Sequence, residues 1–564
     1  MLKCDVAIIG GGPAGSTVGT LLKKYNPSLR VVIVEREKFP RDHVGESHLP
    51  AISRILDEMG VWDKVEAADF PIKVGGTYRW GATDELWDLD FLDGKAFKEE
   101  PRPAQYINQR RQTAFQVDRS IYDKVLLDHA RSMDCEVYEE TKVVNVDLSG
   151  KTIRGLQTSS DHAELGDGRI EARYYVDCSG DAGILRKALG IEIEAPTALR
   201  NIAIWDYWQD AEWAVSIGNG GTRIQIMSLG WGWLWFIPVT PTRTSVGLVL
   251  PAAYYKASGK TKEQIYADAI QSEPLISRLV ANAQQEGNLE ATKDWNFLAK
   301  ELGGANWFLA GDTAGFADPI LSAGMTLAHT SGRKAAYTIL ELDRGNLDST
   351  WLKKEYNDGH RTQIRHHMQF ADFWYSANGR FTDLKEYCTE IAQNAGLTLD
   401  ADSAFRWLAT GGFAVEEPGI ARALGYRVAG IKIVAERLAG SRATWEMSKT
   451  NFWRLNLKDA VEENFASYVE GRIVPLRCFR REDKLLPVSG VYEHVISGLS
   501  RNMDGVMILE DCVNAMVRED GCEPNEAAML VSEAIEAMVT EGWIKSKAVA
   551  SRPFIKMKQP STIR

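Results

Sequence analysis

The sequence is poor in the residues that stabilise small secreted domains and lacks the long apolar runs of membrane proteins. Its 7 cysteines are odd in number and scattered, and no two of them form a CxxC pair. This pattern argues against a disulfide framework and against a zinc site. No apolar run reaches the roughly eighteen residues that a membrane span needs. We therefore expect a cytoplasmic protein with no membrane association and no bound metal.

Basic residues are also in deficit, and internal repeats are absent. The chain has 77 acidic against 66 basic residues, a net charge of −11, so nothing in the charge favours nucleic acid as a partner. A hydrophobic content of 45% in 564 residues is ordinary for a globular protein of several domains. The N-terminal run MLKCDVAIIGGG is short and ends in glycines, which predicts a first strand rather than a signal peptide.

The segment DVAIIGGGPAGSTVGTLLKKY has the pattern of a dinucleotide-binding unit. A buried strand over 5–9 precedes a GxGxxG turn of Gly10, Gly12 and Gly15, and a helix begins at about Pro13. The first glycine permits a tight turn, the second lets the backbone approach a pyrophosphate, and the third lets the helix pack on the strand. The helix N-terminus then offers unpaired N–H groups and a positive dipole end to the phosphates.

A second apolar strand, RVVIVE, ends at Glu35, twenty residues after Gly15. An acid at this position binds ribose hydroxyls in dinucleotide-binding units. A merely structural glycine turn would explain the glycines but not Glu35. The pattern therefore predicts a dinucleotide site.

Three more segments distinguish FAD from NAD. They are EREKFPRDHVGESHLP at 35–50, DCSGDAG at 177–183, and WFLAGDTAGFADPILSAGMTLAH at 307–329. These segments resemble those of the flavoprotein monooxygenase superfamily, in which the GD aspartate, here Asp312, holds the flavin ribityl chain. The resemblance implies an α/β fold with a Rossmann-type FAD-binding domain, a β-sheet substrate-side domain and a mostly helical C-terminal region.

The resemblance also implies a set of cofactor contacts. Arg119 begins a helix and is expected to contact the cofactor. The alternative is that Arg119 is an arginine exposed to solvent at the start of that helix. There is one GxGxxG unit and no second site for a nicotinamide cofactor, so we expect a separate flavin reductase to supply the reduced FAD. The expected FAD-binding residues are Gly10, Gly12, Pro13, Ala14, Gly15, Glu35, Arg36, Arg41, Gly45, Glu46, Ser47, Gln116, Arg119, Asp312, Pro319 and Gly324.

The run GWGWLWFIP at 230–238 places three tryptophans within five positions. Its WLWFIP part matches the WxWxIP signature of the flavin-dependent halogenases. PIKVGGTYRWG at 71–81 resembles the segment that carries the catalytic lysine of that family, here Lys73. GDTAGFADPILSAG resembles its flavin and halide loop, in which the N–H groups of Ala323 and Gly324 would hold a halide. The resemblance covers roughly residues 1 to 375.

The resemblance implies a reaction in two places. Reduced FAD and O2 give a hydroperoxide, which oxidises chloride, bromide or iodide to hypohalous acid. The hypohalous acid travels to Lys73, where an electron-rich aromatic ring is halogenated. A rigid partition must separate the flavin from the ring, and its expected residues are Trp233, Trp235, Ile237 and Pro238.

The alternative for the tryptophans is an ordinary core strand, since aromatic residues favour pleated surfaces. Alternation would then place Trp233 and Trp235 on one face and Leu234 and Phe236 on the other. For Lys73, burial in an apolar stretch would depress the pKa. Its ammonium would hydrogen-bond hypohalous acid, or its amine would form a haloamine, and the sequence leaves both open. The alternative is a surface lysine whose stem covers apolar ground.

One position departs from the family pattern. Tryptophan halogenases carry a glutamate where this chain has Leu321. The departure favours activated rings such as phenols or pyrroles, free or bound to a carrier protein, over free tryptophan. His48, Glu46 and Tyr78 lie near the motifs as candidate proton acceptors, and the sequence gives no reason to choose among them.

The expected domain organisation has three parts. Residues 1–340 form the halogenase core, with FAD-binding segments at about 1–70, 105–190 and 290–340. Residues 341–484 form a helical region that covers the substrate, and 485–564 form a small winged-helix-like module. The module is rich in acids, which favours a protein contact or a homo-oligomer over DNA binding.

Two competing functions remain. An aromatic hydroxylase or reductase of the same superfamily would share the GxGxxG and GD motifs, but not Lys73 and the WxWxIP signature. A flavin-binding regulator would bind FAD without halide-dependent turnover.

Overall fold

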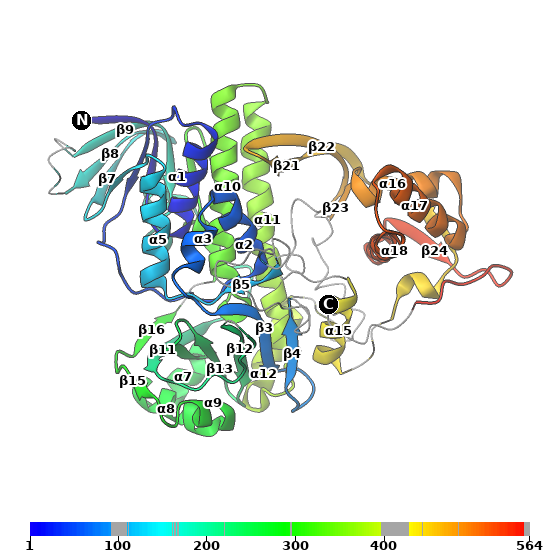
Figure 1. Ribbon diagram of the computed structural model, residues 1–564, viewed down its shortest axis with the longest axis horizontal. Coiled ribbons are helices and arrows are strands. Elements are labelled where there is room, and N and C mark those ends of the chain that lie inside the picture. Colours follow the sequence, from blue (N-terminus) through cyan, green and yellow to red (C-terminus); the bar gives the residue numbers. More distant parts are fainter. Residues whose placement is uncertain are drawn as a thin grey trace. The chain divides into compact units, whose positions relative to one another are not determined.

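The computed structural model of the chain is shown in Figure 1, coloured from blue at the N-terminus to red at the C-terminus. Its contacts divide it into two compact units, Met1–Gly396 with Tyr468–Ile473, and Leu397–Ser467 with Val474–Arg564. Residues 105–109 of the expected FAD-binding segments and 398–427 of the expected helical region lie outside the described residues. The structure describes residues 1–91, 110, 112–160, 162, 165, 168–218, 220–293, 296–395, 397, 428–440, 442, 444–482 and 484–557.

The first unit contains a sheet of order β6-β2-β1-β9-β8-β7, with β18 beside β9. β1 pairs in parallel with β2 and β9, and β18 pairs in parallel with β9. The apolar run VVIV of β2 is buried throughout, as expected of a parallel strand that is covered on both faces. The strands are β1 (Leu2–Ile9), β2 (Val31–Val34), β6 (Glu136–Tyr138), β7 (Lys142–Ser149), β8 (Thr152–Ser159), β9 (Arg169–Asp177) and β18 (Trp307–Leu309).

Helices of different lengths pack beside this sheet. α1 contacts α5 and α10, and α10 runs next to α11 (Figure 1). Asp118 caps α5 by accepting a hydrogen bond from the N–H of Ser120. Asp348 caps α11 by accepting a hydrogen bond from the N–H of Trp351. These helices are α1 (Pro13–Tyr25), α2 (Pro50–Met59), α3 (Trp62–Glu66), α5 (Arg119–Ser132), α10 (Ala323–Arg344) and α11 (Ser349–Ser376).

A second sheet has the order β15-β11-β14-β13-β12-β3-β4, with β5 on β3 and β16 on β11. Most of its pairs are antiparallel, but β12 and β3 are parallel. Its strands are β3 (Ile72–Arg79), β4 (Trp87–Asp90), β5 (Ala114–Phe115), β11 (Asn201–Gln209), β12 (Gly221–Ser228), β13 (Trp233–Pro238), β14 (Arg243–Pro251), β15 (Gln284–Gln285) and β16 (Glu290–Lys293).

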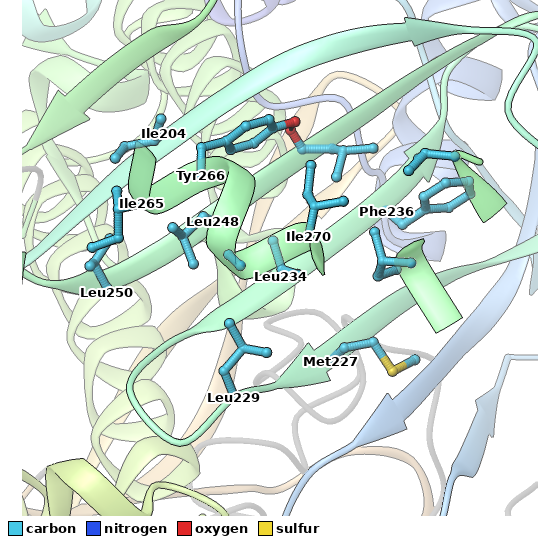
Figure 2. Packing of buried hydrophobic residues seen from close by; sticks show 14 of the residues in the cluster. Ile204, Met227, Leu229, Leu234, Phe236, Leu248, Leu250, Ile265, Tyr266 and Ile270 are labelled. Carbon is cyan, nitrogen blue, oxygen red and sulfur yellow. Dashed lines mark hydrogen bonds between the residues drawn. The ribbon is translucent and has the colours of Figure 1, made fainter. Parts of the chain in front are cut away.

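One face of this second sheet packs on short helices. Leu234 and Phe236 of β13 join a buried cluster with Ile265 and Tyr266 of α8 (Figure 2). The neighbouring Trp233 does not belong to that cluster, so the alternation predicted for β13 is confirmed. The helices on this side are α7 (Ala252–Ser258), α8 (Lys262–Ser272) and α9 (Pro274–Leu279).

Short elements connect the layers of the first unit. A small sheet has the order β10-β17-β19. The connecting elements are η2 (Gly180–Ala182), α6 (Ile184–Ala188), β10 (Ile193–Glu194), β17 (Phe297–Ala299), η3 (Gly311–Thr313), β19 (Gly315–Phe316), η4 (Pro319–Leu321), η5 (Thr382–Leu384) and α12 (Lys385–Asn394).

Strands occupy much of 452–487, where the sequence pattern suggests mostly helix. Glu470 and Gly471 both have positive φ, at 45° and 75°, which suits the tight turn of a β-hairpin between β21 and β22. The EG turn and its flanking β-branched and aromatic residues are the signal that the helical interpretation misses. The elements here are α15 (Val428–Ala439), η6 (Glu446–Lys449), β20 (Phe452–Leu455), β21 (Val461–Val469), β22 (Arg472–Arg481) and β23 (Lys484–Pro487).

The chain continues as three successive helices and a strand in the described residues 490–547. The strand β24 pairs with β20 in antiparallel fashion. Among the residues that the structure describes, no helix is both long and apolar enough to cross a bilayer. The elements are α16 (Gly490–Arg501), α17 (Gly505–Glu519), α18 (Pro524–Thr540) and β24 (Ile544–Lys547).

Candidate active site

The three glycines after β1 have different surroundings. A Cβ at Gly10, whose φ is +104°, would lie 2.3 Å from the carbonyl oxygen of Cys178. A Cβ at Gly15 would lie 1.9 Å from the carbonyl oxygen of Gly10. The protein itself therefore requires these two glycines. A Cβ at Gly12 would meet nothing closer than the Nη2 of Arg41, at 3.6 Å, which leaves room for a ligand against the backbone.

Glu35, which follows β2 directly, supports this turn. Oε2 of Glu35 accepts a hydrogen bond from the N–H of Gly11 at 2.7 Å, and its Oε1 accepts one from the N–H of Glu37 at 3.0 Å. Pro13 and Ala14 begin α1, and no side chain caps that helix start. The N–H groups of the first turn are thus available to an anion. Glu35 lies beside the glycine turn.

Arg119 holds the loop that follows β2. Its guanidinium donates to both carboxylate oxygens of Asp123, at 2.7 and 2.9 Å, and to the carbonyl of Val44 at 2.9 Å. Gly45 in this loop has a φ of +101°. Arg119 is buried, so the solvated alternative is wrong. Arg36 lies outside this cluster, exposed and paired with Glu37 at 3.2 Å.

Several buried polar atoms near this loop have no hydrogen-bond partner among the described residues. They include the Nη1 of Arg41 and both side-chain polar atoms of Gln116. A buried polar atom without a partner is costly, and such atoms usually face a ligand or water. With the open position at Gly12, they show that the residues fit a bound dinucleotide such as FAD.

The GD turn follows β18. Since β18 and β9 are parallel, Asp312 lies at the carboxyl end of the same sheet as the glycine turn. Ser331 of α10 holds the turn by accepting from the N–H of Gly311 at 2.8 Å. Loss of hydration raises the pKa of Asp312 to about 6, and the positive charge of Arg119 opposes that rise. Asp312 therefore lies at the same end of the sheet as the glycine turn.

Lys73 is buried on β3, so the alternative of a surface lysine is wrong. Its Nζ donates to the Oγ of Ser47 at 2.7 Å, to the carbonyl of His48 at 3.0 Å and to the Oγ of Ser322 at 3.4 Å. Burial lowers the pKa of Lys73 to about 7. The neutral amine is therefore well populated at neutral pH. Ser322 is a contact that the sequence reasoning did not identify.

Residues 319–324, called here the halide turn, lead into α10. Ser322 has a φ of 56° and precedes the helix, so the N–H groups of Ala323 and Gly324 lie at the helix N-terminus. Asp318 caps the turn, its side chain accepting from the N–H of Ile320. Pro319 begins it, and the side chain of Leu321 lies outside the described residues. The turn offers two backbone donors to an anion next to Lys73.

The residues predicted to form the partition are Trp233, Trp235, Ile237 and Pro238 of β13. The Nε1 of Trp233 donates to the hydroxyl of Tyr375 at 2.7 Å, and that of Trp235 donates to Ser245 at 3.0 Å. Trp235 lies over Gly247 of the paired strand, where a Cβ would come within 2.1 Å of the indole. Both indoles are thus fixed by a hydrogen bond, and all four residues are buried.

An aromatic cluster adjoins Trp233 on the side away from α8. Trp80 lies edge-on to Trp233, with ring centroids 6.1 Å apart, and contacts Trp374 and Tyr375 of α11. Phe370 stacks on Trp374 at 5.6 Å. α11 thus brings Phe370, Trp374 and Tyr375 into this cluster, next to the partition.

The three candidate proton acceptors differ in their surroundings. Glu46 accepts a hydrogen bond from the hydroxyl of Tyr207 at 2.8 Å, and burial raises its pKa to about 7. His48 is fully buried, and its ring nitrogens have no partner among the described residues. Tyr78 stacks on Trp87 at 4.9 Å, and burial raises its pKa. Of these groups, Glu46 has the pKa best suited to proton exchange near neutral pH.

The comparisons with known proteins agree with this geometry. A family model described as an FAD binding domain matches residues 3–371, so the chain belongs to this family of FAD-binding proteins. The 1H-pyrrole-2-carbonyl-[peptidyl-carrier protein] chlorinase of Pseudomonas fluorescens is 31% identical over 392 residues, which cover 67% of this chain and 85% of that protein. The tryptophan 2-halogenase of Chondromyces crocatus is 29% identical, covering 66% and 68%.

Solved structures resemble the chain as well. The myxobacterial chondrochloren halogenase CndH has a TM-score of 0.60 at 25% identity, covering 78% of this chain and all of that one. CmlS, a flavin-dependent halogenase, has a TM-score of 0.73 at 22% identity, covering 99% and 98%, which shows a shared fold. Within the FAD-binding proteins, the chain is a flavin-dependent halogenase, and the predicted fold class, cofactor and enzyme class are confirmed. Nothing in these relatives favours a hydroxylase, a reductase or a regulator.

Proposed function

We propose that this halogenase passes electrophilic halogen to Lys73, which transfers it to an electron-rich aromatic ring. The observation that carries this proposal is the position of Lys73, buried and in contact with both Ser47 and the halide turn through Ser322. Bound in its reduced form, FAD supplies, with O2, the oxidising power that converts a halide ion into hypohalous acid. A separate flavin reductase provides that reduced FAD.

The glycine turn, Glu35, Gln116, Arg119 and Asp312 would hold the cofactor. The unpaired side-chain atoms of Gln116 and the open backbone at Gly12 support this role. Arg119 would fix the loop that carries Glu46 and Ser47, since it donates to the carbonyl of Val44 in that loop.

The N–H groups of Ala323 and Gly324 would hold the halide ion. They lie at the start of a 22-residue helix, where the dipole favours an anion. The adjacent Lys73 adds positive charge whenever it is protonated. The halide is therefore expected next to the group that later receives the halogen.

The partition would keep the aromatic substrate away from the cofactor. Its two indoles are held by hydrogen bonds to Tyr375 and Ser245, so neither ring can swing aside without losing a bond. A small neutral oxidant passes more easily than an aromatic ring. This arrangement favours halogenation over direct transfer of oxygen to the substrate.

Lys73 would act through its neutral amine. The amine nitrogen takes halogen from hypohalous acid and loses a proton, and water leaves. The ring then takes the halogen from nitrogen, and a nearby base carries the displaced ring proton back to that nitrogen, which restores the amine. The depressed pKa of Lys73 makes the amine available for this step.

The pH dependence should report which form of Lys73 reacts. Since burial lowers the pKa to about 7, the amine fraction rises as pH increases through 7. We expect halogenated product per O2 consumed to rise between about pH 6 and about pH 8 and then level off. Single-turnover product yield, measured alongside flavin reoxidation, checks this. A yield that falls across the same range would show that the ammonium, acting as a hydrogen-bond donor, is the active form.

The substrate would be a phenol or a pyrrole, either free or bound to a carrier protein. Leu321 at the position of the glutamate of tryptophan halogenases supports an activated ring. The Pseudomonas relative, whose name specifies a pyrrole on a peptidyl-carrier protein, supports the carrier-bound form.

The enzyme would act in the cytoplasm, as the absence of a long apolar run suggests.

The test is an assay of the whole chain with a flavin reductase, NADH, FAD and O2. Chloride, bromide or iodide is supplied with a panel of phenols, pyrroles and indoles, free and attached to a carrier protein. We expect a product heavier by one halogen less one hydrogen, formed only when halide is present. A product heavier by one oxygen would identify a hydroxylase. Bound FAD without halide-dependent turnover would identify a regulator.

A further inference from the structure

A chain of buried hydrogen bonds runs from the partition to the halide turn. The Nε1 of Trp233 donates to the hydroxyl of Tyr375 at 2.7 Å. That hydroxyl donates in turn to Oδ1 of Asp318 at 3.2 Å. The same Oδ1 accepts from the N–H of Ile320, in the halide turn, at 3.0 Å. Trp233, Tyr375 and Asp318 come from β13, α11 and the loop before η4, and all are buried.

The direction of each bond is fixed by chemistry. An indole N–H donates only, and an ionised carboxylate accepts only. The Tyr375 hydroxyl has one proton, so it must accept from Trp233 and donate to Asp318. Phenylalanine in its place would leave the indole N–H without this partner and remove one donor from the carboxylate.

Further bonds tie this chain to the rest of the site. Oδ2 of Asp318 accepts from the side-chain amide of Asn201 on β11 at 3.4 Å. Beyond Ile320 the halide turn reaches Ser322, which contacts Lys73 at 3.4 Å. Hydrogen bonds and the backbone of the halide turn therefore join the partition, this turn and Lys73.

We propose that Tyr375 and Asp318 are positioning residues that couple the partition indole of Trp233 to the halide turn. This inference rests on the proposed function, because the turn must bind halide for the coupling to affect catalysis. Asp318 fixes the turn through the N–H of Ile320, and Tyr375 transmits the position of the indole to Asp318. Loosening either contact should weaken halide binding and open the partition together.

The test compares Tyr375→Phe with Tyr356→Phe in the full-length protein loaded with FAD. Tyr356 is a buried tyrosine of the same helix, and its hydroxyl donates to the carbonyl of Leu309 at 2.6 Å, outside the network. In Tyr375→Phe we expect the halide KM to rise about tenfold and halogenated product per O2 to fall, because small displacements at a preorganised site are costly. Tyr356→Phe should leave both close to wild type.

Hydrogen exchange provides a readout that does not depend on catalysis. In Tyr375→Phe, amide exchange should become faster both in peptides spanning 231–238 and in peptides spanning 318–326. Tyr356→Phe should not accelerate both. Faster exchange around the tryptophans alone would overturn the coupling. If wild type makes no halogenated product, the proposed function fails, while the exchange experiment still decides whether the two segments are coupled.

A second variant covers the case in which Tyr375→Phe does not fold. Trp233→Phe removes the donor and keeps the hydroxyl of Tyr375, and it should raise the halide KM in the same direction. When both single variants fold, Tyr375→Phe should add little in the Trp233→Phe background, because both remove the same link. Fully additive effects would contradict the proposal, as would an unchanged halide KM in Trp233→Phe.

Discussion

Replacing Lys73 by alanine is expected to lower the rate of halogenation at least about 100-fold, the scale of a lost catalytic group that reacts directly. Lys73 is buried, and its contacts are Ser47, the carbonyl of His48 and Ser322. No other lysine comes within hydrogen-bond distance of these three groups in the described residues. Flavin reoxidation should continue nearly unchanged, because hypohalous acid forms before Lys73 acts. Product and O2 consumption measured together separate the two steps.

The controls for this variant address folding and charge. Lys73→Met keeps an apolar stem of similar length and should lose activity as Lys73→Ala does. Lys23→Ala removes another buried lysine, whose Nζ donates to the carbonyls of Pro27 and Leu29 at 2.7 and 3.0 Å. It should retain normal product per O2. Product formed at the normal rate by Lys73→Ala would remove Lys73 from the mechanism.

The local parts of the site could be predicted from the sequence. The glycine turn, Glu35 and the alternation of β13 are set by neighbours in the chain and by periodicities of the backbone. Backbone atoms leave no room for a Cβ at Gly10 and Gly15. These atoms belong to the predicted unit itself and to Cys178, which follows the neighbouring strand β9. For this reason, spacing alone indicated a dinucleotide site.

The contacts that organise the site could not be predicted in this way. Lys73 and Ser322 are 249 residues apart, and Trp233 and Tyr375 are 142 apart. Neither periodicity nor a local motif specifies which hydroxyl an indole will find across such distances. The hydroxyl of Tyr375 has no sequence signal that would link it to Trp233. The strands at 452–487 were missed for a different reason, since their EG turn was not given the weight of a hairpin signal.

The glycine turn permits a prediction that separates folding from cofactor binding. Gly15→Ala places a Cβ 1.9 Å from the carbonyl oxygen of Gly10, a backbone atom that cannot move alone. We expect this variant to lose about 1–3 kcal/mol of stability and to lose FAD binding, because α1 must move away from the turn. Thermal unfolding without FAD and flavin titration measure the two effects.

Gly12→Ala should behave differently. Gly12 has a φ of −68°, which alanine adopts freely, and its Cβ would meet only the Nη2 of Arg41 at 3.6 Å. The protein without FAD should therefore unfold at the wild-type temperature, while the affinity for FAD falls at least about tenfold, because the added methyl occupies the space of the pyrophosphate. If Gly12→Ala binds FAD as wild type does, the cofactor does not approach the backbone there. If both variants lose stability equally, the fold rather than the cofactor requires glycine at both positions. Loss of FAD binding without loss of stability in Gly12→Ala thus identifies the position at which the ligand, rather than the fold, requires glycine.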